Sequence, residues 1–302
     1  MRMLNAPSGV VVGVDGSESS LAAVRWAARD AQLRNVDLRL VHVVAPVSHT
    51  TSSSWAGVPA PADSSRLKLE RYAARQIMES ARMAAFDEVA PDVRSRVHSD
   101  VLTGSVVPTL TDYAEHADML VVGRRGRNPV ARAMFGSTSS GLVQHARCPV
   151  AVIHDDESTM ARSPMAPVVV GIDGTPTSEP ATEIAFDEAS RRGVHLIALH
   201  AWNDEGPLHF GRPGHAPIEF AESRAHEEQI LAERLAGWRS RYPDVPVHEV
   251  VVTDRPAPRL LEQAQAAQLL VLGGHSHGRL ARMLLGSVSS AVVTAAHVPV
   301  II

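Results

Sequence analysis

Residues 121–140 read VVGRRGRNPVARAMFGSTSS, and residues 271–290 read VLGGHSHGRLARMLLGSVSS, 150 positions later. Each stretch begins with apolar residues, turns through glycine, crosses a basic segment and reaches Gly-Ser before a helical pattern. A repeat of this length predicts two copies of one structural unit. Because unpaired N–H groups and a partial positive charge gather at a helix N-terminus, each Gly-Ser element predicts an anion-binding site.

The duplication extends beyond these loops. VVVGVDGS at residues 10–17 recurs as VVVGIDGT at residues 168–175, and CPVAVI at 148–153 matches VPVII at 298–302. The offset between the copies falls from 158 positions at the first match to 150 at the last, so the first copy is longer by eight residues. The insertion SHTTSSSWAGVPAPADSS at residues 48–65 holds this extra length, and its Ser/Pro/Gly composition is typical of a surface loop.

We predict a first domain at residues 1–154, a linker at 155–166 and a second domain at 167–302. Each copy alternates short Val-rich runs with longer segments of helical period. Near-continuous apolar runs are typical of strands buried on both faces of a parallel sheet. The sequence therefore predicts an α/β fold of two tandem doubly wound domains, each with a five-stranded parallel sheet flanked by helices. The strands expected in the first copy are residues 10–14, 38–44, 97–102, 119–122 and 149–153.

Composition narrows the class of protein. The chain has 302 residues, of which 45% are hydrophobic and 21% charged, as in ordinary globular proteins. A net charge of −4 lacks the basic excess of a nucleic-acid binder, and no apolar run is long enough to insert into a membrane. The single cysteine, Cys148, cannot form an internal disulfide, which favours a cytoplasmic location. The only lysine, Lys68, lies outside both glycine loops, so neither loop is a lysine-dependent P-loop.

Ligands of open α/β sheets bind beyond the carboxyl ends of the strands, where the strand order reverses. In the first copy, Asp15 follows the first strand, and Gly136-Ser137 opens the helix after the fourth strand. Glycine lets the backbone approach an anion closely, and serine can donate to a phosphate oxygen. A helix cap without any ligand is the competing interpretation of Gly-Ser. Two matching copies with arginines nearby favour phosphate binding over a cap alone.

The aspartates after the first strands have two open interpretations. Asp15 and Asp173 can hold ribose hydroxyls or a phosphate-bound Mg²⁺. They can equally serve the local fold, because Asp-Gly is strong turn chemistry and Asp15-x-x-Glu18 resembles a capping box. Residue chemistry alone does not decide between these roles.

The histidines give weaker signals. His42 and His200 stand inside apolar runs, where a histidine is more often a satisfied core residue than a ligand or a base. His275 and His277 are two residues apart in a loop, without the further ligands that a metal site needs. We predict no catalytic residue and no metal site of the protein's own.

The spacing G-x2-G-x9-G-[S/T] is complete in the first copy, at Gly123, Gly126, Gly136 and Ser137. Together with VGVDGS near the start and CPVAVI at residues 148–153, it resembles the universal stress protein family in its tandem-domain, actinobacterial form. The resemblance covers nearly the whole chain. It implies a five-stranded parallel sheet flanked by helices, with ATP at the strand ends and Mg²⁺ as a candidate companion of the phosphates.

By this resemblance, Asp15 and the backbone of Val43 would frame the adenosine, and the glycines with the intervening arginines would wrap the phosphates. The residues expected at the first nucleotide site are Gly13, Val14, Asp15, Val43, Val122, Gly123, Arg124, Arg125, Gly126, Arg127, Gly136, Ser137 and Thr138. The residues expected at the second site are Gly171, Ile172, Asp173, Ala201, Leu272, Gly273, Ser276, Gly286, Ser287 and Val288.

The second copy departs from the signature at one position, because Ser276 occupies the place of Gly126. If that position needs a positive φ, serine costs about 1 kcal/mol or more, which corresponds to about tenfold in affinity. Gly274 and Gly278 lie on either side of Ser276 and can let the loop shift its register. We therefore predict a firmer first site and a weaker or altered second site.

The resemblance implies a nucleotide-dependent regulator in the stress or dormancy response, acting through a protein partner that the sequence does not identify. Slow ATP hydrolysis or phosphotransfer is one alternative, although no convincing base stands beside the Gly-Ser loop. A ligand-free dimerisation scaffold is another. The apolar final strands, residues 149–153 and 299–302, are sheet edges. The resemblance implies that they pair antiparallel within the chain as an internal pseudo-dimer, on which we expect a homodimer to be built.

Overall fold

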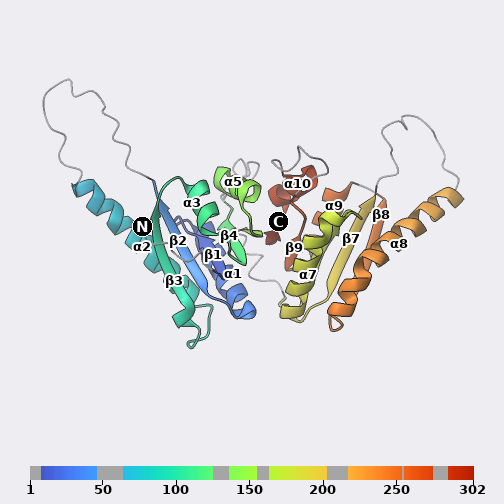
Figure 1. Cartoon of the computed structure of the whole chain (residues 1–302), viewed down its shortest axis with the longest axis horizontal. Coiled ribbons are helices and arrows are strands. Elements are labelled where there is room, and N and C mark those ends of the chain that lie inside the picture. The colour runs from blue at the N-terminus through green and yellow to red at the C-terminus, as the bar shows by residue number, and fades with distance from the viewer. Residues whose placement is uncertain are drawn as a thin grey trace, which may run out of the picture. The chain divides into compact units, whose positions relative to one another are not determined.

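A computed structural model describes residues 8–45, 64–124, 136–154, 163–202, 217–253, 255–274 and 285–302. The described residues up to Arg124 and from Ser137 to Val150 form one compact unit, and those from Ala151 onwards form the other. Figure 1 colours the first unit from blue to green and the second from yellow to red. Within the described ranges, no helix is both long enough and apolar enough to cross a membrane.

The first unit is a parallel sheet covered by helices on both faces (Figure 1). Its strand order is β3-β2-β1-β4, followed by β5, of which only Val150 groups with this unit, and β1 pairs in parallel with both β2 and β4. Helix α1 packs on α2 over one face, and α3 packs on α5 over the other. Its elements are β1 (Val10–Gly13), α1 (Glu18–Arg34), β2 (Leu38–Val44), α2 (Ser64–Phe86), a 3-10 turn (Arg94–Arg96), β3 (Val97–Thr103), α3 (Val106–Tyr113), β4 (Met119–Gly123), α5 (Ser137–His145) and β5 (Val150–Ile153).

The second unit repeats this plan. Its strand order is β10-β9-β6-β7-β8, with β6 paired in parallel to both β7 and β9. Ala151 and Val152 of β5, which group with this unit, pair antiparallel with Ile301 and Val300 of β10. Its elements are β6 (Val168–Ile172), a 3-10 turn (Pro176–Ser178), α7 (Glu179–Arg192), β7 (Leu196–Trp202), α8 (Pro217–Arg241), β8 (Val247–Thr253), α9 (Pro256–Ala264), β9 (Leu269–Val271), α10 (Ser287–Ala295) and β10 (Val300–Ile301).

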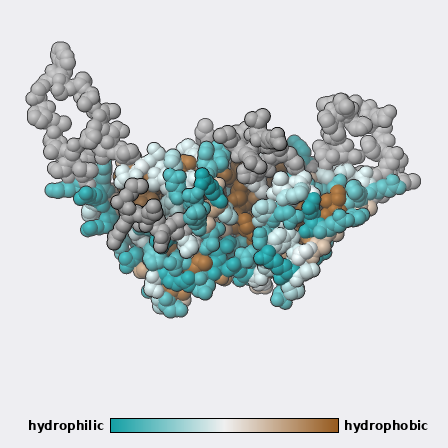
Figure 2. Space-filling view, viewed as in Figure 1, coloured by the Kyte–Doolittle hydropathy of each residue, from teal (hydrophilic) through white to brown (hydrophobic). Residues whose placement is uncertain are grey.

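Each unit buries its own core. The central strands β1 and β6 carry three consecutive valines that are fully buried, as expected of strands with helices on both faces. In the second unit, Phe186 of α7 is fully buried and stacks on Trp238 and Tyr242 at the end of α8. The surface of α2 and α8 that faces the viewer in Figure 2 is mainly hydrophilic. This agrees with helices that turn one apolar face to the sheet.

The predicted α/β class with two tandem parallel sheets is confirmed. Helix α2 begins at Ser64, so the last two residues of the predicted insertion at 48–65 are helical. Residues 48–63 of the insertion lie outside the described residues. The helical period of residues 66–90 predicts a helix over that range, but α2 ends at Phe86. Pro91 accounts for part of this difference, because the residue before a proline disfavours helical geometry.

Candidate functional site

A pocket of about 290 Å³ lies at the carboxyl ends of the strands in the second unit. Parallel strands end at the same edge of a sheet, so the ends of β6, β7 and β9 meet there. The start of α9 and the N-terminus of α10 complete the wall. The lining residues are Gly171, Ile172, Asp173, Thr177, Ser178, Leu199, Ala201, Pro256, Leu260, Leu272, Gly273, Gly286, Ser287, Val288 and Ser289.

The N-terminus of α10 supplies backbone donors to this pocket. Gly286 is its N-cap and makes no side-chain cap hydrogen bond. The amide of Ser290 donates to the Gly286 carbonyl at 2.8 Å, so the amides of Ser287, Val288 and Ser289 precede that first helical hydrogen bond. Three such amides, with the partial positive charge of the helix end, suit an anion. Ser287 is exposed and is the first helical residue, so of the Gly-Ser pair it is Gly286 and not Ser287 that caps the helix.

A buried serine fixes this helix end against the sheet. The Ser289 hydroxyl donates to the Gly273 carbonyl at 2.6 Å, which ties the first turn of α10 to the residues that follow β9. The first unit has the same tie, in which the Ser139 hydroxyl donates to the Gly123 carbonyl at 3.2 Å. Both serines are buried. The repeated hydrogen bond places each helix N-terminus at the carboxyl edge of its sheet.

The aspartates after the first strands organise turns. In the first unit, Asp15 Oδ1 accepts from the backbone N–H of Ser17 at 3.0 Å and from its hydroxyl at 2.5 Å. In the second unit, Asp173 Oδ1 accepts from the backbone N–H of Thr175 at 2.9 Å and from its hydroxyl at 2.7 Å. The capping-box interpretation of Asp15 is wrong, because Ser17 is the N-cap of α1 and accepts from the amide of Ser20.

The two strand-end histidines are satisfied by hydrogen bonds. His42 Nδ1 lies 2.7 Å from the carbonyl oxygen of Val14, and His200 Nδ1 lies 2.8 Å from that of Ile172. His200 is buried, and its Nε2 lies 2.9 Å from the Glu227 carboxylate. Both rings therefore brace the first strand's end against the second strand, as a core histidine does. Groups of three potential metal ligands do not occur among the described residues.

The pocket brings together every residue predicted for the second site that the structure describes: Gly171, Ile172, Asp173, Ala201, Leu272, Gly273, Gly286, Ser287 and Val288. Ser276, Arg125, Gly126 and Arg127, with the histidines His275 and His277, lie outside the described residues.

In the first unit, the predicted residues take equivalent places. Gly13 ends β1, Val14 and Asp15 follow it, and Val43 lies in β2. The others are Val122 and Gly123 at the end of β4, the buried Arg124 after it, and Gly136, Ser137 and Thr138 at the start of α5. The segments after the first and fourth strands thus stand at the same edge of the first unit's sheet.

Sequence reasoning missed several lining residues. Ser289 is the most informative of these, because its hydroxyl bond to Gly273 depends on a contact between segments 16 residues apart. Its signal was present in the repeat, since GSTSS and GSVSS match at the second serine as well as the first. The apolar wall from α9, formed by Pro256 and Leu260, has no comparable motif.

Comparison with known proteins agrees with this architecture. The model of the family described as "Universal stress protein family" matches residues 9–154 and 165–302. Universal stress protein Rv1996 of Mycobacterium tuberculosis is 53% identical over 300 residues, covering 97% of this chain and 94% of that protein. Universal stress protein Rv2623 of the same organism is 43% identical over 298 residues, covering 99% and 97%.

A universal stress protein from Archaeoglobus fulgidus shares the fold, with a TM-score of 0.65 at 19% identity over 97% of this chain and 95% of that one. The duplicated strand-end loops, the two parallel sheets and the near full-length match to these relatives lead to one conclusion. The chain belongs to the universal stress protein family, with two copies of the family's domain in tandem.

Proposed function

We propose that this chain binds ATP at the carboxyl edge of each sheet and that nucleotide occupancy regulates a protein partner in the stress or dormancy response. The observation that carries the proposal is the pocket of the second unit. It joins the end of β6, the end of β9 and the N-terminus of α10 around a volume of about 290 Å³. Those are the three segments that the duplicated motifs single out.

The chemistry of the lining fits an adenine nucleotide. Leu199, Ala201 and Leu260 offer an apolar wall for a base, and the first amides of α10 offer donors for phosphate oxygens. Gly273 leaves room beside the backbone, since a Cβ there would be 3.6 Å from its nearest neighbour, the Thr177 carbonyl oxygen. Mg²⁺ would enter with the phosphates, and Asp173 is the acidic residue in the lining.

The proposal assigns regulation rather than turnover to the site. Hydrolysis needs a base that positions water at the γ-phosphate. The Asp15 and Asp173 carboxylates instead accept the hydrogen bonds of the turns that follow β1 and β6. ATP binding without multiple turnovers follows from this arrangement. A steady-state phosphate-release assay on the purified chain, with Asp15→Ala as the comparison, tests that expectation.

Replacing Ser287 by aspartate tests the phosphate-binding role of α10. Aspartate suits the first turn of a helix, so folding is kept, but its charge opposes a phosphate at the same amides. Ser287→Asp should weaken ATP binding at the second site by about tenfold or more, whereas the isosteric, neutral Ser287→Asn should bind within about threefold of the parent chain. Calorimetric titration measures both variants. Equal affinities for the two would contradict the proposal.

We further propose that the chain acts in the cytoplasm as a homodimer. The family's duplicated domain supports an assembly in which each chain carries two nucleotide sites. Light scattering of the purified protein provides the test, and a strictly monomeric mass over the accessible concentrations would remove the homodimer.

A further inference from the structure

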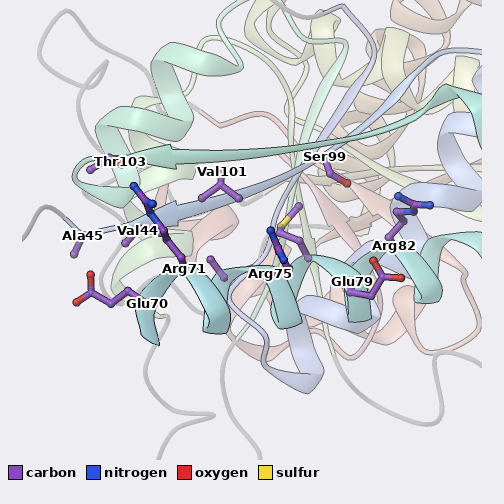
Figure 3. Close-up of a pocket in the computed structure, with 12 residues that line it drawn as sticks. Val44, Ala45, Glu70, Arg71, Arg75, Glu79, Arg82, Ser99, Val101 and Thr103 are labelled. Atoms are coloured by element: carbon purple, nitrogen blue, oxygen red, sulfur yellow. The ribbon is translucent and has the colours of Figure 1, made fainter. Parts of the chain in front are cut away.

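A second cavity, of about 590 Å³, lies in the first unit. It opens between α2 and the outward face of β2 and β3 (Figure 3). Its lining residues are Val44, Ala45, Glu70, Arg71, Ala74, Arg75, Met78, Glu79, Arg82, Ser99, Val101 and Thr103. We call it the α2 groove.

The floor of the α2 groove is apolar. Ala74 and Met78 are buried on α2, while Val101 of the edge strand β3 is 52% exposed. An exposed β-branched residue beside buried apolar ones leaves hydrophobic surface in contact with water, and covering it is favourable. The volume of the α2 groove, about 590 Å³, falls within the range of small-molecule sites, roughly 300–1,000 Å³.

Three arginines line the groove, of which Arg82 lies 5.1 Å from the ring centroid of Phe86 and the other two stand over the apolar floor. Arg71 and Arg75 are one helical turn apart on α2, and Figure 3 shows both side chains extending towards the strands. Glu70 lies at the end of the groove near Ala45, and Glu79 at the opposite end. Neither arginine forms an ion pair with a residue in the described ranges. Two adjacent guanidiniums are suited to bind a carboxylate or phosphate through charge-assisted hydrogen bonds.

The second unit provides an internal comparison. Ile77 of α2 stands against Gly16, and Ile230 of α8 stands against the equivalent Gly174. These two contacts align α2 with α8 at an offset of 153 residues in the sequence. In this register, Arg71 of α2 corresponds to Arg224 of α8.

At the positions that match Ala74 and Arg75, the second unit carries glutamates. Glu227 takes the place of Ala74 and reaches back to His200 at 2.9 Å. Glu228 takes the place of Arg75 and pairs with Arg224 at 2.9 Å. The open floor, and the two guanidiniums that form no ion pair with a described residue, are therefore features of the first unit's helix and not of the duplicated fold.

We propose that the α2 groove is a binding site for an amphipathic anion, a molecule with an aliphatic body and one carboxylate. The aliphatic body would lie on Ala74, Met78 and Val101, and the carboxylate would lie between Arg71 and Arg75. None of its lining residues is among those assigned to the proposed nucleotide sites, and it reaches the carboxyl ends of β2 and β3 only at Val44, Ala45 and Thr103.

Titration with sodium decanoate, followed by the ¹³C-methyl NMR signal of Met78, tests the proposal. The signal is assigned with Met78→Leu, and n-decanol serves as the uncharged counterpart of the probe. Decanoate should shift the Met78 signal saturably and bind about tenfold or more tightly than decanol, because the two guanidiniums act only on the carboxylate.

Charge-removing variants sharpen the test. The pair Arg71→Gln and Arg75→Gln should weaken decanoate binding by about tenfold or more. Arg224→Gln, a change at the matched position of the second unit, should leave it unchanged. Both arginines are exposed, so the fold is kept, and amide NMR spectra verify this. Unchanged affinity in the double variant, equal binding of decanol, or binding of an acidic peptide without decanoate would overturn the proposal.

Discussion

At the residue scale, the two matching glycines at the carboxyl ends of β4 and β9 differ in their surroundings. A Cβ on Gly123 would lie 2.3 Å from the Ser19 carbonyl oxygen and 2.8 Å from the Ser20 amide, both backbone atoms of α1. A Cβ on the matching Gly273 would meet its nearest atom, the Thr177 carbonyl oxygen, at 3.6 Å. The glycine at the first position is therefore required by close packing of the helix, whereas the second is not.

This difference predicts unequal effects of alanine. Gly123→Ala should lower the free energy of unfolding by about 1–3 kcal/mol, because backbone atoms cannot move aside cheaply. Gly273→Ala should change it by about 0.5 kcal/mol or less. Urea-induced unfolding measures both variants. Equal losses of stability in the two would contradict the packing argument.

Cys148 gives a prediction for pH. Burial raises the pKa of its thiol from 9.0 to about 11, so the folded chain holds roughly a hundredfold less thiolate near neutral pH than the unfolded chain. Its reaction with a disulfide reagent should therefore be slow at pH 8 and accelerate in urea. Because the folded pKa is the higher one, the contribution to stability is complete below pH 9.0 and is lost as the pH rises towards about 11. Equal labelling rates for folded and unfolded protein at pH 8 would be inconsistent with this account.

At the scale of elements, the helix that opens each candidate site is held by one hydroxyl. Ser289→Ala removes the 2.6 Å hydrogen bond to the Gly273 carbonyl and leaves that part-buried acceptor without this donor. We expect a loss of about 1–2 kcal/mol in stability and weaker ATP binding at the second site, because the amides of α10 are no longer fixed. Thermal unfolding and calorimetric titration measure the two effects.

Ser290→Ala is the matched control, because Ser290 lies one position further along α10 and does not line the pocket. It should bind ATP as the parent chain does. If Ser289→Ala loses stability without losing affinity, the hydroxyl supports the fold alone and the positioning of the amides is not what limits binding.

The elements differ in how far the sequence could predict them. Periodicity, turn residues and the internal repeat predict the strand and helix segments. They also predict that Asp173 and Ser287 lie at the carboxyl edge of the sheet. The bond from Ser289 to Gly273 and the wall from Leu260 could not be predicted, because they depend on which distant segments pack together. The α2 groove was also beyond prediction, since it arises from the space that Ala74 leaves between a helix and a sheet.

At the scale of the whole molecule, each unit has a core of its own, so local damage should stay local. Phe186 is fully buried against Trp238 and Tyr242, and Phe186→Ala should cost about 3–5 kcal/mol in the second unit. Hydrogen exchange should then quicken in β6 and β7 but not in β1 and β2. Phe86→Ala, in α2 of the first unit, should reverse the pattern to a smaller extent. Faster exchange in both units after either change would show that they unfold as one.

The central claim is that each tandem unit holds ATP between the turn after its first strand and the helix that begins at Gly-Ser. A crystal structure with a non-hydrolysable ATP analogue tests this most directly. We predict phosphates against the amides of Ser287, Val288 and Ser289 in the second unit, the base beside Ala201, and the corresponding arrangement at Ser137 in the first unit. Both strand-end sites empty at saturating nucleotide, or nucleotide bound only elsewhere, would contradict the account.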